Sequence, residues 1–249
     1  MLTIQAMNSL STTAMVLAAG FGMRMRPLTL TKPKPLLEVG GRTMLDLALD
    51  RLVAFGIRRA VVNTHYLAEQ IEAHLASRKD IEIIISHEHD ILDTGGGIKN
   101  ALSYFGDQPF FALNADLPWM DGEKPALSRM AEAWNPVSMD ALLLLMKTGK
   151  ARGFDSKGDF ALDADGHARR KDIAPPRPYV MLSAQILKPE LFTERKEHVF
   201  SNNLIWNEAE AKDRLYGIEH TGTCYHVGTP EDWQNANELL TTGKGWGVP

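Results

Sequence analysis

The chain has 249 residues, of which 44% are hydrophobic and 23% are charged. This length and composition fit one large α/β domain with a full core, and they argue against a disordered chain. A formal net charge of −4 argues against a general nucleic-acid or membrane-surface binder, so any basic site must be local.

The one cysteine, Cys224, cannot form an internal disulfide, which fits a reducing cytosol. No apolar run approaches the length of a membrane span. Residues 1–13 are polar and lack the basic start and apolar core of a signal peptide. We therefore expect a cytoplasmic protein with a flexible extension over 1–13, a single domain over 14–241 and a loose, glycine-rich tail over 242–249.

An apolar run over 14–19 predicts the first buried strand, and a basic glycine loop follows it. Gly20 and Gly22 permit a loop whose backbone N–H groups face an anion. Arg24 adds a positive charge beside that loop, and Lys34 stands between two prolines that stiffen the backbone around it. The combination predicts a polyphosphate site. It is neither a Walker loop nor a dinucleotide fingerprint, because neither Gly-Lys-Ser/Thr nor a third glycine follows.

Strands and helices alternate through the rest of the first half. A capping pair, Thr43 with Asp46, predicts the start of the first helix, and Thr229 with Asp232 predicts the start of the last. Alternation at this spacing predicts parallel pairing and a doubly wound α/β sheet. Strands are predicted at 60–63, 81–85, 110–113, 141–146, 180–187 and 215–219, and helices at 43–56, 67–75, 98–105 and 203–212.

Two loops of the first half carry further candidates. Asp116 follows the strand at 110–113, and ligands of open α/β sheets bind outside the carboxyl ends of strands. A metal or ribose contact is therefore expected there, with helix capping as the alternative. The three glycines that follow Thr94, placed before a helix, allow a ligand to approach the backbone closely, with an ordinary helix start as the alternative.

The glycine loop and the Pro-Lys-Pro segment together resemble the signature of the sugar-1-phosphate nucleotidyltransferase family. The stretch from Gly20 to Thr29 matches its Gly-x-Gly-x-Arg loop, and Pro33 to Leu36 matches its Pro-Lys-Pro element. The resemblance implies a Rossmann-like, GT-A-like fold of the nucleotide-diphospho-sugar transferase type, with a mixed, mostly parallel sheet. It also implies an enzyme that transfers a nucleotidyl group to a sugar 1-phosphate and releases pyrophosphate.

Within that family the chain resembles short uridylyltransferases, through 92–98, 158–160 and 227–229. This implies UTP and N-acetylmuramic acid α-1-phosphate as substrates, in cell-wall recycling, with no nucleic-acid or membrane partner. A mannose-1-phosphate guanylyltransferase or another NDP-sugar pyrophosphorylase is the first alternative. A non-catalytic regulatory subunit that binds nucleotide sugars is the second. The oligomeric state stays open.

The resemblance also implies roles for individual residues. Arg24, Lys34 and Asp116 become the catalytic candidates, and Arg24 and Lys34 also bind the nucleotide. Asp116 and His226 would hold Mg²⁺, with Mn²⁺ or Co²⁺ as alternatives. The other nucleotide-binding candidates are Leu17, Ala18, Ala19, Gly20, Phe21, Gly22, Met23, Gly95 and Gly96. The sugar-binding candidates are Asn114, Lys157, Asp159 and Ser183.

Two positions depart from the family pattern. His226 stands where the family usually has an aspartate, its second metal ligand, and Ser183 stands where it has a glycine. The second departure bears on the sugar pocket. The first bears on the metal, because imidazole suits softer metals better than it suits Mg²⁺. We expect His226 to ligate the metal directly or through water, with an ordinary packed histidine as the alternative.

Overall fold

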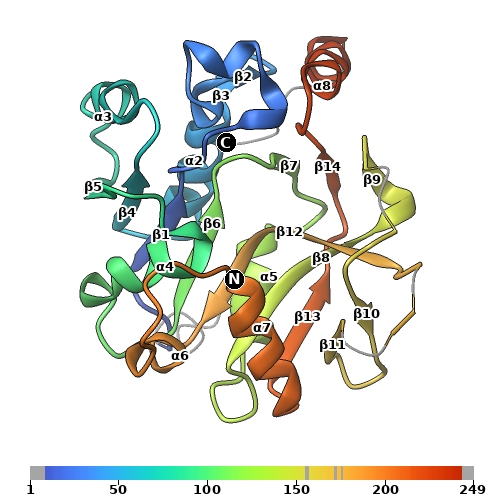
Figure 1. Cartoon of the computed structure of the whole chain (residues 1–249). Helices are drawn as coiled ribbons and strands as arrows, with labels where there is room; N and C mark the ends of the chain where they lie inside the picture. Colours follow the sequence, from blue (N-terminus) through green and yellow to red (C-terminus); the bar gives the residue numbers. More distant parts are fainter. Residues whose placement is uncertain (1–8, 155–156, 171–172, 175, 243–249) are drawn as a thin grey trace.

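The computed structural model describes residues 9–154, 157–170, 173–174 and 176–242 (Figure 1). The expected loose ends at 1–8 and 243–249 lie outside the described residues. Residues 9–13, the described part of the expected flexible extension, pack against the fold. Leu10 is buried, and the Ser11 N–H donates to Pro109 O at 2.8 Å.

The centre of the fold is a seven-stranded sheet in the order β13-β8-β12-β6-β1-β4-β5. β12 alone runs antiparallel to both of its neighbours, and the other neighbouring pairs are parallel. The expectation of a mixed, mostly parallel α/β sheet is therefore confirmed. The strands are β1 (Thr13–Leu17), β4 (Arg59–Thr64), β5 (Glu82–His87), β6 (Phe110–Asn114), β8 (Ala141–Lys147), β12 (Tyr179–Leu187) and β13 (Leu215–Glu219).

The direction of winding reverses beside β1. From β1 the chain forms β4 and β5 on one side, and then returns to place β6 on the other side. Leu17, the last residue of β1, pairs with Asn63 on one neighbour and with Asn114 on the other. The loops that follow β1 and β6 therefore diverge at one edge of the sheet, which is where open α/β sheets bind ligands.

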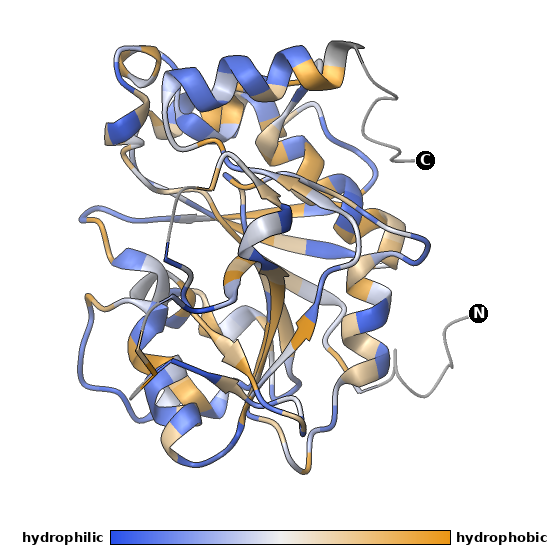
Figure 2. Ribbon diagram, turned by 90° about the vertical axis from the view of Figure 1, so that its right-hand side faces the viewer, coloured by the Kyte–Doolittle hydropathy of each residue, from blue (hydrophilic) through white to orange (hydrophobic). Residues whose placement is uncertain are grey.

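Two layers of helices cover the sheet because alternate residues of each strand face opposite sides. In β1, Ala14 and Val16 pack with α2, α3 and α5, whereas Met15 and Leu17 pack with α4, α6 and α7. Figure 2 shows mostly apolar colours on the central strands, between helices with hydrophilic stretches. The helices are α2 (Met44–Phe55), α3 (Ala68–Leu75), α4 (Asp93–Asn100), α5 (Ala126–Ala133), α6 (Glu190–Thr193), α7 (Asn202–Ala211) and α8 (Pro230–Thr242).

The predicted helix boundaries agree well where capping residues mark them. The Thr43 hydroxyl accepts the Asp46 N–H at 3.0 Å, and Gly56 ends α2 at φ 104°. Thr229 accepts the Asp232 N–H at 3.2 Å and donates its own N–H to the Asp232 carboxylate at 2.9 Å. Both pairs satisfy N–H groups that a helix start leaves without partners. No helix of the described chain is both long and apolar enough to span a membrane.

Several short elements lie outside the main sheet. β10 (Ala161–Leu162) and β11 (Ala168–Arg169) form a hairpin whose turn contains Asp165-Gly166, a pair that favours tight turns. The sequence did not predict the hairpin β2 (Glu38–Val39) and β3 (Arg42–Thr43), or the sheet of β7 (Trp119–Met120), β14 (Thr223–Tyr225) and β9 (Ala151–Arg152). Short 3-10 turns are η1 (Met23–Met25), η2 (Leu28–Leu30), η3 (Lys34–Leu36), η4 (Leu102–Tyr104) and η5 (Thr148–Lys150).

The last helix holds the hairpin that follows the glycine loop. The Trp233 indole N–H donates to Glu38 O at 2.7 Å, and the Gly40 N–H donates to the Asn237 side chain at 2.9 Å. Ala236 packs in an apolar cluster that also contains Met25, in η1 of the glycine loop. α8 therefore supports the β2–β3 hairpin and the η1 turn of the glycine loop from the far end of the chain.

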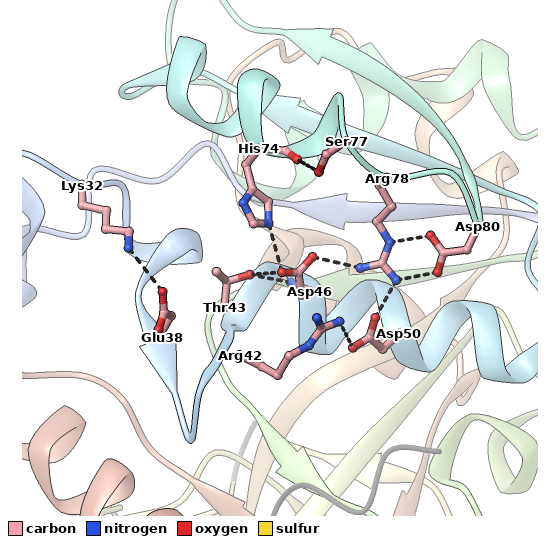
Figure 3. A network of polar contacts seen from close by, with 10 residues as sticks. All are labelled: Lys32, Glu38, Arg42, Thr43, Asp46, Asp50, His74, Ser77, Arg78 and Asp80. Carbon is pink, nitrogen blue, oxygen red and sulfur yellow. Dashed lines mark hydrogen bonds and ion pairs between the residues drawn. The ribbon is translucent and has the colours of Figure 1, made fainter.

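A network of charged side chains joins the start of α2 to the loop between α3 and β5 (Figure 3). Arg78 lies at its centre with a side chain only 9% exposed. Its guanidinium contacts the carboxylates of Asp46 at 2.9 Å, Asp50 at 2.5 Å and Asp80 at 2.9 Å. His74 also contacts Asp46, at 3.0 Å. The network fixes α2 against the neighbouring βαβ unit.

Asp46 should make the stability of the fold depend on pH. Its burial opposes ionisation, but the Thr43 hydroxyl and the nearby His74, Arg42 and Arg78 outweigh it and hold the pKa of Asp46 below its ordinary value. A carboxylate with a lowered folded pKa contributes stability above its unfolded pKa of about 3.9, and that contribution is lost as the pH falls toward the folded pKa.

We therefore expect Asp46→Asn to lower the free energy of unfolding by about 1.5–3 kcal/mol at pH 7, the range for hydrogen bonds to charged groups. The difference from the unmodified chain should shrink below about pH 4. Urea unfolding across pH 3 to 7 measures this, with the exposed Asp107→Asn as control. A deficit that stays constant across this range would show that the charge of Asp46 does not matter.

Candidate active site

Two adjoining cavities lie where the winding of the sheet reverses. The larger has a volume of about 460 Å³ and the smaller about 260 Å³. Leu17, Gly20 and Asp116 line both cavities. The cavities therefore meet between the end of β1 and the end of β6, at the edge of the sheet that the topology favours for ligands.

The glycine loop forms the wall of the smaller cavity. Gly22 has φ 60°, a left-handed conformation that favours glycine. A Cβ atom there would lie 3.0 Å from the Thr29 side chain and 3.1 Å from Lys34 Cβ. The Thr29 hydroxyl donates to Gly22 O at 2.8 Å, so the loop folds back on itself. This compact loop brings Arg24 and Lys34 to the same cavity.

Lys34 and Asp116 form an ion pair where the two cavities meet. Lys34 Nζ lies 2.8 Å from Asp116 Oδ2, and Lys34 is only 9% exposed. Desolvation opposes ionisation of Asp116, but Lys34, with smaller contributions from His226 and Arg24, holds its pKa below the ordinary value. Asp116 is therefore an anion at neutral pH, beside the positive charges of Lys34 and Arg24 in the smaller cavity.

The structure brings the first group of nucleotide-binding candidates together. Ala19 and Phe21 line the larger cavity, and Ala18, Gly22 and Met23 line the smaller, beside the residues that line both. Phe21 is 38% exposed, with its ring 5.6 Å from that of Tyr66. Contact of these residues with a nucleotide stays a prediction, but their placement fits it.

The triple glycine lies elsewhere than expected, and its contact with a nucleotide stays a prediction. It lies within the first turns of α4, not ahead of the helix. Both the Gly95 and the Gly96 N–H groups donate to Phe200 O, at 2.9 and 3.0 Å. A Cβ atom would lie 2.4 Å from the Phe200 ring at Gly95 and 2.2 Å from His198 O at Gly96. The glycines thus allow the segment before α7 to pack closely on α4, and neither lines either cavity.

Two buried polar residues that the sequence analysis missed support the larger cavity. Asn63 Oδ1 accepts the Ala18 N–H at 2.7 Å, and Asn63 Nδ2 donates to Glu88 Oε1 at 2.7 Å. Glu88 Oε2 accepts the Leu92 N–H at 3.0 Å. This chain of bonds links the loop after β1 to the turn after β5. Asn63 is the last residue of a predicted strand, which was the signal that could have revealed it, whereas Glu88 lies beyond the end of the next predicted strand and carried no such signal.

The sugar-binding candidates are more scattered. Asn114 lines the larger cavity, and its Oδ1 is buried without a partner within the described residues. Ser183 is 1% exposed and donates to Leu117 O at 2.7 Å. Asp159 is exposed and accepts the Met181 N–H at 3.4 Å, and Lys157 is exposed. These last three line neither cavity, so their contact with a sugar stays a prediction.

His226 lies close to the ion pair without lining either cavity. Its Nδ1 is buried and has no hydrogen-bond partner within the described part of the chain. Its Nε2 lies 2.2 Å from the place that a Cβ atom would take at Gly228, and its ring lies 4.3 Å from that of Phe154. The missing side chain of Gly228 is therefore what accommodates the imidazole.

The donors near Asp116 fit a divalent cation. Asp116 supplies a carboxylate, the ligand that Mg²⁺ prefers, and His226 supplies a nitrogen atom without a partner. A separate group, Asp163, Asp165 and His167, lies in the turn between β10 and β11. There Asp163 Oδ1 accepts the N–H groups of the other two, so these residues serve to form the turn.

Comparison with known proteins agrees with this geometry. The family described as "Nucleotidyl transferase" matches residues 13–155, which include the glycine loop and Asp116. The chain belongs to the nucleotidyl transferase family. Enzymes of this family typically use a divalent metal ion.

Two curated relatives span most of this nucleotidyltransferase. One, from Caulobacter vibrioides, is 43% identical over 88% of this chain and 92% of its own length. The other, from Neisseria meningitidis serogroup B, is 33% identical over 87% of this chain and 93% of its own length. Both are named N-acetylmuramate alpha-1-phosphate uridylyltransferase.

A solved structure confirms the fold at low sequence identity. It is a putative glucose-1-phosphate thymidylyltransferase from Bacillus anthracis, with a TM-score of 0.76 and 18% identity over 93% of this chain and 96% of its own. The nucleotide-diphospho-sugar transferase fold inferred from the sequence is therefore confirmed.

The position of His226 leads to a prediction about the metal. Burial lowers its pKa, and Lys34 and Arg24 lower it further although Asp232 opposes them, so the imidazole is neutral at pH 7. If it contributes to metal binding, activity falls as the pH drops through this lowered pKa. His226→Asp should remove that loss and shift metal preference toward Mg²⁺ by about tenfold.

Rates with Mg²⁺, Mn²⁺ and Co²⁺ from pH 5 to 8 measure both effects, with the exposed His89→Asp as control. An unchanged metal preference and pH profile in His226→Ala would assign His226 a packing role only.

Proposed function

We propose that this enzyme transfers the uridylyl group of UTP to N-acetylmuramic acid α-1-phosphate, giving a UDP-sugar and pyrophosphate, in the cytoplasm and in cell-wall recycling. The observation that carries the proposal is the Lys34–Asp116 pair, which stands between a basic cavity and a larger cavity with an apolar wall. The two relatives named above support the choice of nucleotide and sugar.

The charges of the two cavities indicate how UTP lies. Arg24, Lys34 and the backbone of the glycine loop suit the triphosphate, and arginine suits bidentate phosphate contact. The larger cavity carries carboxylates at Glu88 and Asp93, which would repel phosphate, and apolar side chains at Leu17 and Phe21. The nucleoside therefore belongs in the larger cavity, with the α-phosphate at the junction of the two.

The chemistry at the junction is an in-line displacement. An oxygen of the sugar phosphate attacks the α-phosphorus, and the bond to the β-phosphate breaks, so pyrophosphate leaves with the bonding electron pair. The attacking phosphate is already ionised, so no strong general base is needed. Lys34 holds positive charge where the two anions meet, and Arg24 stabilises the charge that grows on the leaving group.

A divalent cation would be held by Asp116, with His226 as the second donor. When bound, the cation supplies positive charge that offsets the charge of the α-phosphate. Asp116 Oδ2 is paired with Lys34. Lys34 therefore also keeps the carboxylate ionised and oriented.

A substrate panel tests the proposal directly. Each of the four NTPs is combined with the 1-phosphates of N-acetylmuramic acid, N-acetylglucosamine, glucose and mannose, and pyrophosphate release is measured. UTP with N-acetylmuramic acid α-1-phosphate should be the fastest pair. GTP with mannose 1-phosphate as the fastest pair would assign a guanylyltransferase. UTP binding without pyrophosphate release from any pair would assign a regulatory subunit.

Lys34→Ala should abolish most of the turnover without unfolding the protein. Removing one preorganised charge at a transition state costs about 10²–10³ in kcat. Steady-state kinetics and thermal unfolding measure the two effects. Lys32→Ala is the matched control, because Lys32 is 45% exposed and pairs only loosely with Glu38 at 3.9 Å. Near-normal turnover in Lys34→Ala would remove Lys34 from the mechanism.

A further inference from the structure

We propose that the Asp93 side chain reads the nucleotide base by accepting a hydrogen bond from its ring N–H, the N3–H of uracil. The inference deepens the proposed function and rests on it. Asp93 lines the larger cavity at the start of α4. The backbone N–H groups of the nearby candidates Gly95 and Gly96 are bonded to Phe200 O.

The covalent order of a nucleotide places the base near Asp93. The triphosphate occupies the smaller cavity, and the two cavities share Leu17, Gly20 and Asp116. The ribose, which is attached to the α-phosphate, therefore lies beside these shared residues and Asn114. The base continues away from them along the larger cavity, whose remaining wall includes Glu88, Ile91, Asp93, Thr94 and Val199.

The conformation of Asp93 fixes its carboxylate. Asp93 has φ 60°, a left-handed conformation that is uncommon outside glycine. Its Oδ1 accepts the Thr94 N–H at 2.5 Å and the Thr94 hydroxyl at 3.2 Å. The same hydroxyl accepts the Asn202 N–H at 2.9 Å, which ties the arrangement to α7. Within the described residues Oδ2 has no hydrogen-bond partner, so it remains as an acceptor.

The other polar side chains at this end of the cavity are already committed. Both Glu88 oxygens accept hydrogen bonds, from Asn63 and from the Leu92 N–H, and Glu88 is 2% exposed. The Asn63 amide bonds to Glu88 and Ala18. Among the described side chains of this wall, Asp93 therefore offers the available carboxylate.

A carboxylate at this place distinguishes bases by their ring nitrogen. Uracil carries a hydrogen atom on N3 and donates it to the carboxylate. Cytosine has a lone pair on N3, which a carboxylate repels. An asparagine at position 93 presents either a carbonyl or an NH₂ group, so it can form a hydrogen bond with N3 of either base. The carboxylate should therefore favour UTP over CTP, and the amide should not.

The test compares UTP with CTP in Asp93→Asn. The ratio of the UTP to the CTP dissociation constants is measured by competition against a fluorescent UTP analogue, and the ratio of kcat/KM by pyrophosphate release. Both preferences for UTP should fall about tenfold to a hundredfold, the range for a hydrogen bond to a charged group. The matched control is Asp90→Asn, an exposed aspartate that does not line the cavity.

A second variant distinguishes the loss of the carboxylate from a disturbance of the fold. Asp93→Gly removes the carboxylate and accepts the positive φ without strain, and it should lose the same UTP preference. An unchanged UTP-to-CTP ratio in both variants would overturn the inference. A protein that prefers GTP would refute the proposed uridylyl transfer but still test Asp93. Guanine also carries a ring N–H, at N1, so the variants should then lose preference for GTP over ATP, and an unchanged ratio would overturn the inference.

Discussion

The contact between Lys34 and Asp116 is the constraint around which the rest of the site is arranged. An ammonium group that is nearly excluded from water is costly unless an anion compensates it, and the carboxylate lies 2.8 Å away. The two residues come from opposite sides of the point where the sheet reverses its winding. The glycine turn and the strand order bring these two charges together.

The parts of the structure that local chemistry determines were predictable from the sequence. Alternating apolar segments predicted the main strands, because a buried parallel strand is apolar throughout. The capping pair of Thr43 and Asp46 predicted the start of α2, because a hydroxyl there satisfies an N–H group that the helix leaves without a partner. The apolar strands also predicted that the loops after them, which carry Arg24, Lys34 and Asp116, meet at one edge of the sheet.

The parts that depend on distant contacts were not predictable. Nothing local to Gly95 and Gly96 indicates that Phe200, more than a hundred residues later, accepts their hydrogen bonds. The sequence alone indicates a solvated carboxylate at Glu88, whereas in the fold this carboxylate accepts a hydrogen bond from the Asn63 side chain. The two-residue strands are too short to show any periodicity. The sugar contact of Ser183 stays a prediction of the resemblance, and nothing in the sequence indicates that its hydroxyl donates to Leu117 O.

The last helix has a consequence for how the protein forms in the cell. Trp233 bonds to the carbonyl of Glu38, 195 positions earlier in the chain, and Ala236 packs in the cluster that contains Met25. Chains are synthesised from the N-terminus, so α8 is made after all seven strands of the central sheet. The glycine loop is among the first segments made, yet its supporting helix is among the last. A nascent chain can therefore assemble its central sheet while its phosphate site still lacks this support.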